Sequence, residues 1–189
     1  MRGLELETRA GLPEALGVLL QDYPREAWDA DPGFSQLIRF WLERHLMFRR
    51  LIEVLNAEAE QVLDATMEPR VFAAHLARYG HLLTGELHAH HSIEDAHYFP
   101  RLKVLDERVG WGFDILDRDH HAIDGHLAGF VEDANAVLRA ISEGTKHRDA
   151  LARHRGGVVR LGGFLDRHLT DEEELVVPVL LKYAPSGLV

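Results

Sequence analysis

The sequence predicts an all-α fold, an up-down-up-down four-helix bundle preceded by a short N-terminal helical extension. Apolar residues recur at helical rather than alternating spacing along the chain, and no run of β-branched residues bounded by turns suggests a sheet. Four long apolar stripes joined by short connections must bury themselves against each other. No Pro/Gly/Ser-rich linker or block of charge divides the chain. We therefore expect one bundle domain, residues 34–184, after an extension of residues 1–33.

The extension and the first long helix are set by local signals. A short helix is expected over residues 13–20, ended by the Tyr-Pro step at 23–24, and the DADPG segment at 29–33 forms a turn. The first long helix covers about residues 34–64. Alternating spacing of three and four puts a histidine in its core stripe. That stripe is Ile38, Trp41, His45, Phe48, Ile52 and Leu55.

Thr66 and Pro69 mark the cap and first turn of the second long helix, which Pro100 kinks or ends. Its stripe is Phe72, Leu76, Tyr79, Leu83, Leu87, His90, Glu94 and His97. The spacing of this stripe includes His90 and leaves the adjacent His91 on a polar helix face, which we expect to be exposed to solvent.

A Gly-Trp-Gly break at residues 110–112 precedes the third long helix, and Gly144 ends it. Its stripe is Leu116, His120, Ile123, Leu127, Val131, Ala134, Leu138 and Ile141. The fourth stripe is Val158, Leu161, Leu165, His168, Glu172, Leu175 and Val179. Every stripe thus carries a histidine, and a buried polar side chain without a partner costs about 1–3 kcal/mol. A shared metal centre would remove that cost.

One pattern occurs twice with identical spacing. His90, Glu94 and Pro100 lie in HHSIEDAHYFPRL, and the second copy in HLTDEEELVVPVL has its histidine at 168, its glutamate at 172 and its proline at 178. Residues four apart share one face of a helix, so each pair offers an imidazole nitrogen and a carboxylate to the same point. Of the 13 histidines, only these two have a glutamate four residues later. The repeat indicates a metal motif used twice.

The predicted metal ligands are His45, His90, Glu94, His120, His168 and Glu172. Four imidazoles and two carboxylates suit two ions bridged by both carboxylates, each ion holding about two imidazoles. This donor set favours two non-haem iron ions, with manganese and zinc ranked behind iron. Because these ligands are too few to saturate two six-coordinate ions, an open position is expected for a small diatomic or peroxide ligand.

Two further residues have open roles. Asp124 either binds the metal, accepts a hydrogen bond from His120, or faces solvent, and we favour the hydrogen bond over ligation. His97, one turn beyond Glu94, is either a fifth imidazole ligand or an interior polar residue near the end of the bundle. The other histidines are expected at the surface: His75, His81, His88, His91, His121, His126, His147 and His154.

Composition excludes several classes of function. The chain has no cysteine, so disulfides, thiolate zinc sites and thiol catalysis are ruled out. A formal net charge of −10, with Lys and Arg scattered along the chain, disfavours nucleic acid. No apolar signal core or membrane-spanning run is visible, so cytoplasm is the expected compartment and a membrane partner is not expected. The sequence does not identify a protein partner, and a homodimer is one assembly that it allows.

The HHSIED…YFP and DEE…VP segments resemble the hemerythrin-like (HHE cation-binding) domains, over roughly residues 37–182. The resemblance implies a four-helix bundle around a non-haem di-iron centre with the six ligands named above. Oxygen-carrying hemerythrins have a second third-helix histidine where this chain has Asp124. Their last carboxylate falls at the position of Glu173, whereas Glu172 resembles the bacterial and regulatory branches. These departures argue against pure oxygen transport.

The leading interpretation is therefore a di-iron protein that binds or senses oxygen, nitric oxide, peroxide, or redox or iron status. An iron-dependent enzyme, peroxidase- or catalase-like, or an iron-donating repair protein is the alternative. A ferritin-type oxidase is disfavoured because its second Glu-x-x-His motif fails at Leu175. A metal-free interaction bundle, with Trp41, Trp111 and the N-terminal segment as partner surface, is the third interpretation.

Overall fold

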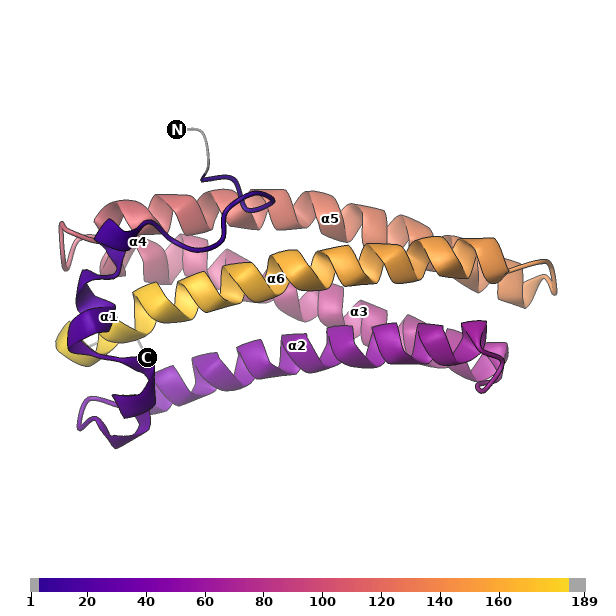
Figure 1. The fold of residues 1–189 in the computed structure, drawn as a ribbon, viewed down its shortest axis with the longest axis horizontal. Coiled ribbons are helices and arrows are strands. Elements are labelled where there is room, and N and C mark those ends of the chain that lie inside the picture. The colour runs from indigo at the N-terminus through magenta and orange to yellow at the C-terminus, as the bar shows by residue number, and fades with distance from the viewer. Residues whose placement is uncertain (1–3, 184–189) are drawn as a thin grey trace. The chain divides into compact units, whose positions relative to one another are not determined.

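The computed structural model describes residues 4–183, and this part of the chain is helical without any strand (Figure 1). This confirms the predicted all-α class. Residues 1–3 of the expected extension and residue 184 of the expected bundle lie outside the described residues. Most of the chain forms four long helices, α2 (Gln36–Leu63), α3 (Pro69–Ile93), α5 (Gly110–Ser142) and α6 (Arg148–Tyr183). None of the described helices has the length and apolarity needed to span a membrane.

Contacts divide the chain into two compact units, and each long helix contributes a segment to both. The first unit contains residues 4–46, 90–121 and 166–183, and the second contains residues 47–89 and 122–165. We refer to them below as the first and second unit.

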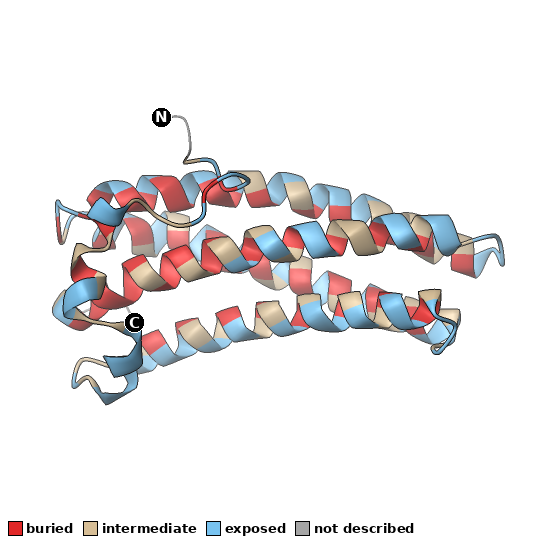
Figure 2. Ribbon diagram, viewed as in Figure 1, coloured by how far each residue is buried: buried red, intermediate tan, exposed pale blue. Residues whose placement is uncertain are grey.

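The first unit has an apolar core to which the N-terminal segment, residues 4–35, contributes. That segment forms η1 (Glu14–Leu16), α1 (Val18–Asp22) and η2 (Arg25–Ala30), and its buried side chains are Leu16, Leu19 and Trp28. Burying a leucine contributes about 1.5–3 kcal/mol. The segment packs where α6 has the run LVVPVLL, which is apolar on every side and buried throughout residues 175–181 (Figure 2). A helix without a polar face must be covered on all sides, and the N-terminal segment supplies part of that cover.

Pro100 does not end its helix. After α3, residues Glu94–Tyr98 form a wider π turn, η3, and the helix continues as α4 (Phe99–Leu102). Proline lacks an amide hydrogen, and its ring clashes with the carbonyl four residues earlier, so the turn before Pro100 widens. The π turn begins at Glu94, one of the predicted ligands.

The glycines at 110–112 do not break the chain as expected, because they form the first turn of α5. A Cβ on Gly112 would lie 2.8 Å from the Leu175 side chain, and one on Gly110 would lie 2.7 Å from the carbonyl oxygen of Lys103. Glycine at these positions permits close packing rather than a turn.

The second unit has an ordinary apolar core. Its helix segments bury single stripes, including Phe48, Leu55, Phe72, Leu83, Ile123, Val137, Val158 and Leu161. Gly144, with φ of +67°, follows the end of α5, as predicted. Pro69 begins α3, also as predicted. Thr66, however, donates its hydroxyl hydrogen bond to the Gln61 carbonyl, so it closes α2 rather than capping α3.

Candidate metal centre

Five histidines and two glutamates gather in the interior of the first unit, in two groups of potential ligands. Within each group, the ligand atoms lie within 4.8 Å of one another. The first group is His45, His90, Glu94 and Glu172, and the second is His91, His120 and His168. The residues come from α2, α3, η3, α5 and α6 and are all buried.

In the first group, two imidazoles meet. His45 Nε2 lies 3.0 Å from His90 Nε2, and His90 Nε2 lies 3.0 Å from Glu94 Oε1. His45 Nε2 is also 3.5 Å from Glu172 Oε1. The indole N–H of Trp41 donates to that same oxygen of Glu172. Trp41 is therefore buried at the centre rather than offering a partner surface.

In the second group, the His91 ring stacks on His120, with ring centroids 3.9 Å apart and planes 8° apart. His168 meets His120 edge to face, with centroids 4.8 Å apart. His120 Nε2 lies 3.6 Å from Glu94 Oε2, and His168 Nε2 lies 3.4 Å from Glu172 Oε2.

The two glutamates lie between the groups. Glu94 presents Oε1 to His90 of the first group and Oε2 to His120 of the second. Glu172 likewise presents Oε1 to His45 and Oε2 to His168. This is the disposition of two carboxylates that could each bridge a pair of ions.

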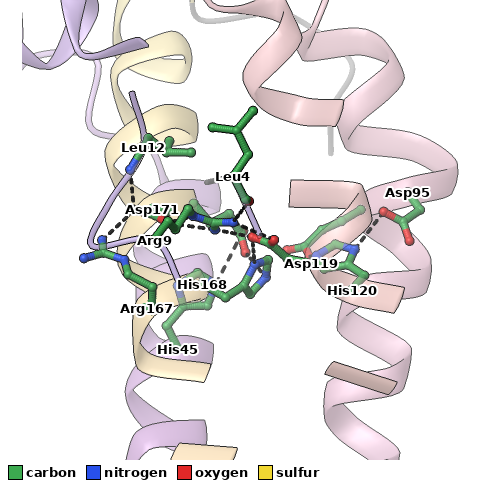
Figure 3. Close-up of polar contacts among 12 residues, drawn as sticks. Leu4, Arg9, Leu12, His45, Asp95, Asp119, His120, Arg167, His168 and Asp171 are labelled. Atoms are coloured by element: carbon green, nitrogen blue, oxygen red, sulfur yellow. Dashed lines mark hydrogen bonds and ion pairs between the residues drawn. The ribbon is translucent and has the colours of Figure 1, made fainter. Parts of the chain in front are cut away.

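Three of the imidazoles are held from behind by carboxylates. His45 Nδ1 is 3.0 Å from Glu173, His120 Nδ1 is 2.8 Å from Asp95, and His168 Nδ1 is 3.4 Å from Asp119, the last two pairs being drawn in Figure 3. A carboxylate at Nδ1 fixes the tautomer and the ring orientation, as it does behind metal-binding histidines. It leaves Nε2 directed at the other ligand groups.

Several buried polar atoms of the cluster have no hydrogen-bond partner. They are both oxygens of Glu94, Glu172 Oε2, Nε2 of His120 and His168, and both ring nitrogens of His91. Each such atom costs about 1–3 kcal/mol, and native interiors contain few of them. A metal centre satisfies nitrogen and oxygen donors of this kind, so these residues fit a bound cation.

A family model for the hemerythrin HHE cation-binding domain matches residues 36–180. The chain belongs to this family. The match includes all the clustered histidines and glutamates and leaves the N-terminal segment outside. No curated protein and no solved structure matches the chain.

Burial gives the candidate ligands of this hemerythrin domain unequal pKa values when no metal is bound. Burial and the nearby charge of Glu172 raise the pKa of Glu94 well above its usual range. Burial opposes ionisation of Glu172 too, but His45 and His168 outweigh it and hold its pKa well below normal. Burial lowers the pKa of His90 to about 3. For His168, burial is outweighed by contacts with Asp119 and Glu172, which raise its pKa to about 9. Metal binding would therefore displace protons, from Glu94 and His168 among others.

The structure brings together all six residues predicted as ligands: His45, His90, Glu94, His120, His168 and Glu172. It leaves His97 and Asp124 exposed. The carboxylate at His120 Nδ1 is Asp95 rather than Asp124. Glu173 is buried as well, behind His45.

His91 was wrongly assigned to the surface, since it is 4% exposed and belongs to the second group. His90 and His91 lie three and four residues after the buried Leu87, and both spacings fall on the same helix face. The resemblance offered a second signal that another histidine is buried, because this chain has Asp124 where oxygen-carrying hemerythrins have a second third-helix histidine. His91, rather than His97, is the fifth imidazole of the cluster.

His154, also expected at the surface, is fully buried in the second unit. Its ring lies against Phe72 and Phe130, and neither ring nitrogen has a hydrogen-bond partner. Burial lowers its pKa to about 4. The remaining histidines assigned to the surface are exposed or half-buried, as predicted: His75, His81, His88, His121, His126 and His147.

Proposed function

We propose that this hemerythrin-family protein holds two iron ions and binds or senses oxygen, nitric oxide, peroxide, or redox or iron status. The observation that carries the proposal is the arrangement of Glu94 and Glu172, each with one oxygen toward each histidine group. Bridging carboxylates between two sets of imidazoles suit a pair of ions rather than one.

Under this proposal, His45 and His90 hold one ion, and His91, His120 and His168 hold the other, while Glu94 and Glu172 serve both. One ion then receives two imidazoles and the other three, fewer donors than two six-coordinate ions accept. The seven nitrogen- and oxygen-donor residues suit iron, and zinc ranks behind it because closed zinc sites hold four ligands, whereas the second ion would have five. A reduced iron pair supplies electrons and an open coordination position to a small oxidant or diatomic ligand.

The chain's own groups hold this site in place. Glu173, Asp95 and Asp119 orient three of the imidazoles, and the Trp41 indole fixes one oxygen of Glu172. Because the ligand residues are buried, bulk water is kept from the metal-facing atoms.

The proposal includes the up-down-up-down bundle expected from the sequence. Residues 64–68 join α2 to α3, and residues 143–147 join α5 to α6. Connections this short favour antiparallel neighbours.

The test is metal analysis with an optical spectrum, on protein purified without added metal and on protein reconstituted anaerobically with ferrous iron. We expect about two iron ions per chain, as two bridging carboxylates require. The matched control is His97→Ala, an exposed histidine one turn from Glu94, which should leave the stoichiometry unchanged. Folded protein that refuses iron, or that saturates at one ion, would contradict the proposal.

Mixing the reduced protein with oxygen then separates the roles. A single stoichiometric oxidation accompanied by a change in helix packing favours a sensor. Sustained turnover with peroxide would instead identify an enzyme, and reversible uptake of oxygen a carrier.

A further inference from the structure

Two arginines of the N-terminal segment bind carboxylates that hold candidate metal ligands. Both lie before residue 36, where the family match begins. Arg9 contacts Asp119, the residue behind His168, and Arg25 contacts Glu173, the residue behind His45. Through its carboxylate partner, each arginine is thus connected to a histidine of a different group.

The contacts of Arg9 are buried. Its Nη1 lies 2.7 Å from Asp119 Oδ1, its Nη2 bonds Asp119 Oδ2, and its Nε lies 2.8 Å from Asp171 Oδ2 (Figure 3). The Arg9 side chain is 2% exposed, and those of Asp119 and Asp171 are 3% and 0% exposed. Replacing buried ion pairs by apolar residues is often neutral or stabilising, so stability alone is a weak reason for this arrangement.

The contacts of Arg25 are nearer to solvent. Its Nη1 lies 2.6 Å from Glu173 Oε2, and Glu173 Oε1 lies 3.0 Å from His45 Nδ1. The Arg25 side chain is 45% exposed and lies over the Trp28 ring, 4.7 Å from its centroid. The two chains of contacts have the same order, arginine to carboxylate to histidine.

Asp171 ties the N-terminal segment to α6 beside Glu172. The Leu12 amide donates to Asp171 Oδ1 at 3.2 Å, and Arg9 Nη1 donates to the Leu4 carbonyl at 3.0 Å. Arg167 bonds Asp171 and donates to the Ala10 carbonyl at 2.6 Å. The position of residues 4–12 is therefore linked to that of a bridging glutamate.

We propose that Arg9 and Arg25 are positioning residues that make the N-terminal segment part of the metal centre. The inference rests on the proposed function and extends it beyond the family domain. Each guanidinium holds a carboxylate by charge-assisted hydrogen bonds, and each carboxylate holds the ring of one ligand histidine. Coupling between two sites is reciprocal, so iron binding must also hold the segment more firmly.

The experiment compares the full chain with Arg9→Gln and Arg25→Gln, all loaded with ferrous iron. It measures the rate at which an excess of ferrous chelator removes iron, and the hydrogen exchange of the Leu12 amide with and without iron. Arg155→Gln is the matched control, because Arg155 pairs with Glu60 at 3.0 Å and that exposed pair does not contact a candidate ligand.

We expect Arg9→Gln to release iron about tenfold faster than the unaltered chain, the low end of the usual loss for a group bonded directly to a ligand, because Arg9 acts through Asp119. Arg25→Gln should have a smaller effect, because solvent screens its half-exposed contact. Iron should slow exchange at Leu12 in the unaltered chain and in Arg155→Gln but not in Arg9→Gln. Arg25→Lys should restore slow release, since it keeps the charge.

Arg9→Gln leaves two buried aspartates without their cation and can unfold the segment for that reason alone. Arg9→Gln combined with Asp171→Asn removes one positive and one negative charge, so the net charge of the cluster is unchanged. This double variant should still release iron faster.

Release at the unaltered rate from the double variant and from Arg25→Gln would overturn the inference while leaving the proposed function intact. An unaltered chain that binds no iron would instead overturn the proposed function, and this inference with it.

Discussion

The two units of this protein are built from the same four helices, but the first adds a buried polar cluster to its apolar core, whereas the core of the second is almost wholly apolar. The two groups of candidate ligands in the first unit contain five imidazoles and two carboxylates, several of whose atoms have no hydrogen-bond partner within the described chain. The second unit encloses apolar side chains and a single buried histidine, His154. A helix can thus change along its length from an ordinary packing element to one that carries candidate metal ligands.

This difference between the two cores predicts which unit depends on bound metal for its stability. Side-chain burial stabilises the second unit without a metal ion, because apolar groups need no hydrogen-bond partners. The first unit also buries polar atoms without hydrogen-bond partners, a cost that a bound ion would offset. Variants should therefore separate the two units by their dependence on iron.

The largest expected effect is loss of both ions on truncating a glutamate. Because Glu94 and Glu172 each serve both histidine groups, Glu94→Ala or Glu172→Ala should remove the ions together rather than one at a time. Metal analysis and ferrous titration measure this directly. Loss of only one ion would show that the affected carboxylate is terminal.

Comparing Glu173→Ala with Glu172→Ala tests which of these two neighbouring glutamates on α6 bridges the ions. We expect this variant to keep both ions with about 10–100-fold weaker affinity, because Glu173 contacts the Nδ1 side of His45 and belongs to neither group of candidate ligands. If Glu173→Ala were more damaging than Glu172→Ala, the bridging role would belong to Glu173.

A cavity in the second unit should affect stability without affecting metal. Phe72 is fully buried there, so Phe72→Ala should cost about 3–5 kcal/mol of unfolding free energy. Denaturant unfolding of the metal-free chain measures the loss, and iron titration should give unchanged stoichiometry in the folded variant. Loss of iron from still-folded Phe72→Ala would break the proposed separation between the units.

The sequence predicted what depends on periodicity and missed what depends on local geometry. The six residues predicted as ligands interrupt apolar stripes of regular spacing, so their inward positions follow from the pattern. His91 lies one residue from His90, and a stripe drawn through one phase excludes its neighbour even when a helix face is wide enough for both. Arg9 and Arg25 carry no periodic signal, because their partners are more than 100 residues away in the chain. Such contacts emerge only from tertiary structure.

His91→Ala tests the corrected phase. The second group has three imidazoles, so removing one should weaken binding of one of the two ions by at least about tenfold. The matched control is His121→Ala, which alters an exposed histidine adjacent to His120. Calorimetric titration with ferrous iron distinguishes the two sites. Equal iron affinities for His91→Ala and His121→Ala would show that His91 is not a ligand.

The smallest effect expected at neutral pH is that of His154→Leu. It removes two buried nitrogens without partners from a site between Phe72 and Phe130, so it should stabilise the chain by about 1 kcal/mol.

The difference in unfolding free energy between His154→Leu and the unaltered chain should grow in acid. Burial lowers the pKa of His154 in the folded chain to about 4, below its ordinary value of 6.5. The unfolded chain then binds the proton more readily. The unaltered protein should therefore keep full stability above pH 6.5 and lose on the order of 3 kcal/mol as the pH falls toward 4. His154→Leu should lack that part of the acid sensitivity in denaturant unfolding of metal-free protein. A variant less stable than the unaltered chain at pH 7 would show that water or a shifted side chain satisfies the histidine. The second unit would then contain a polar feature of its own, and its core would differ less from that of the first.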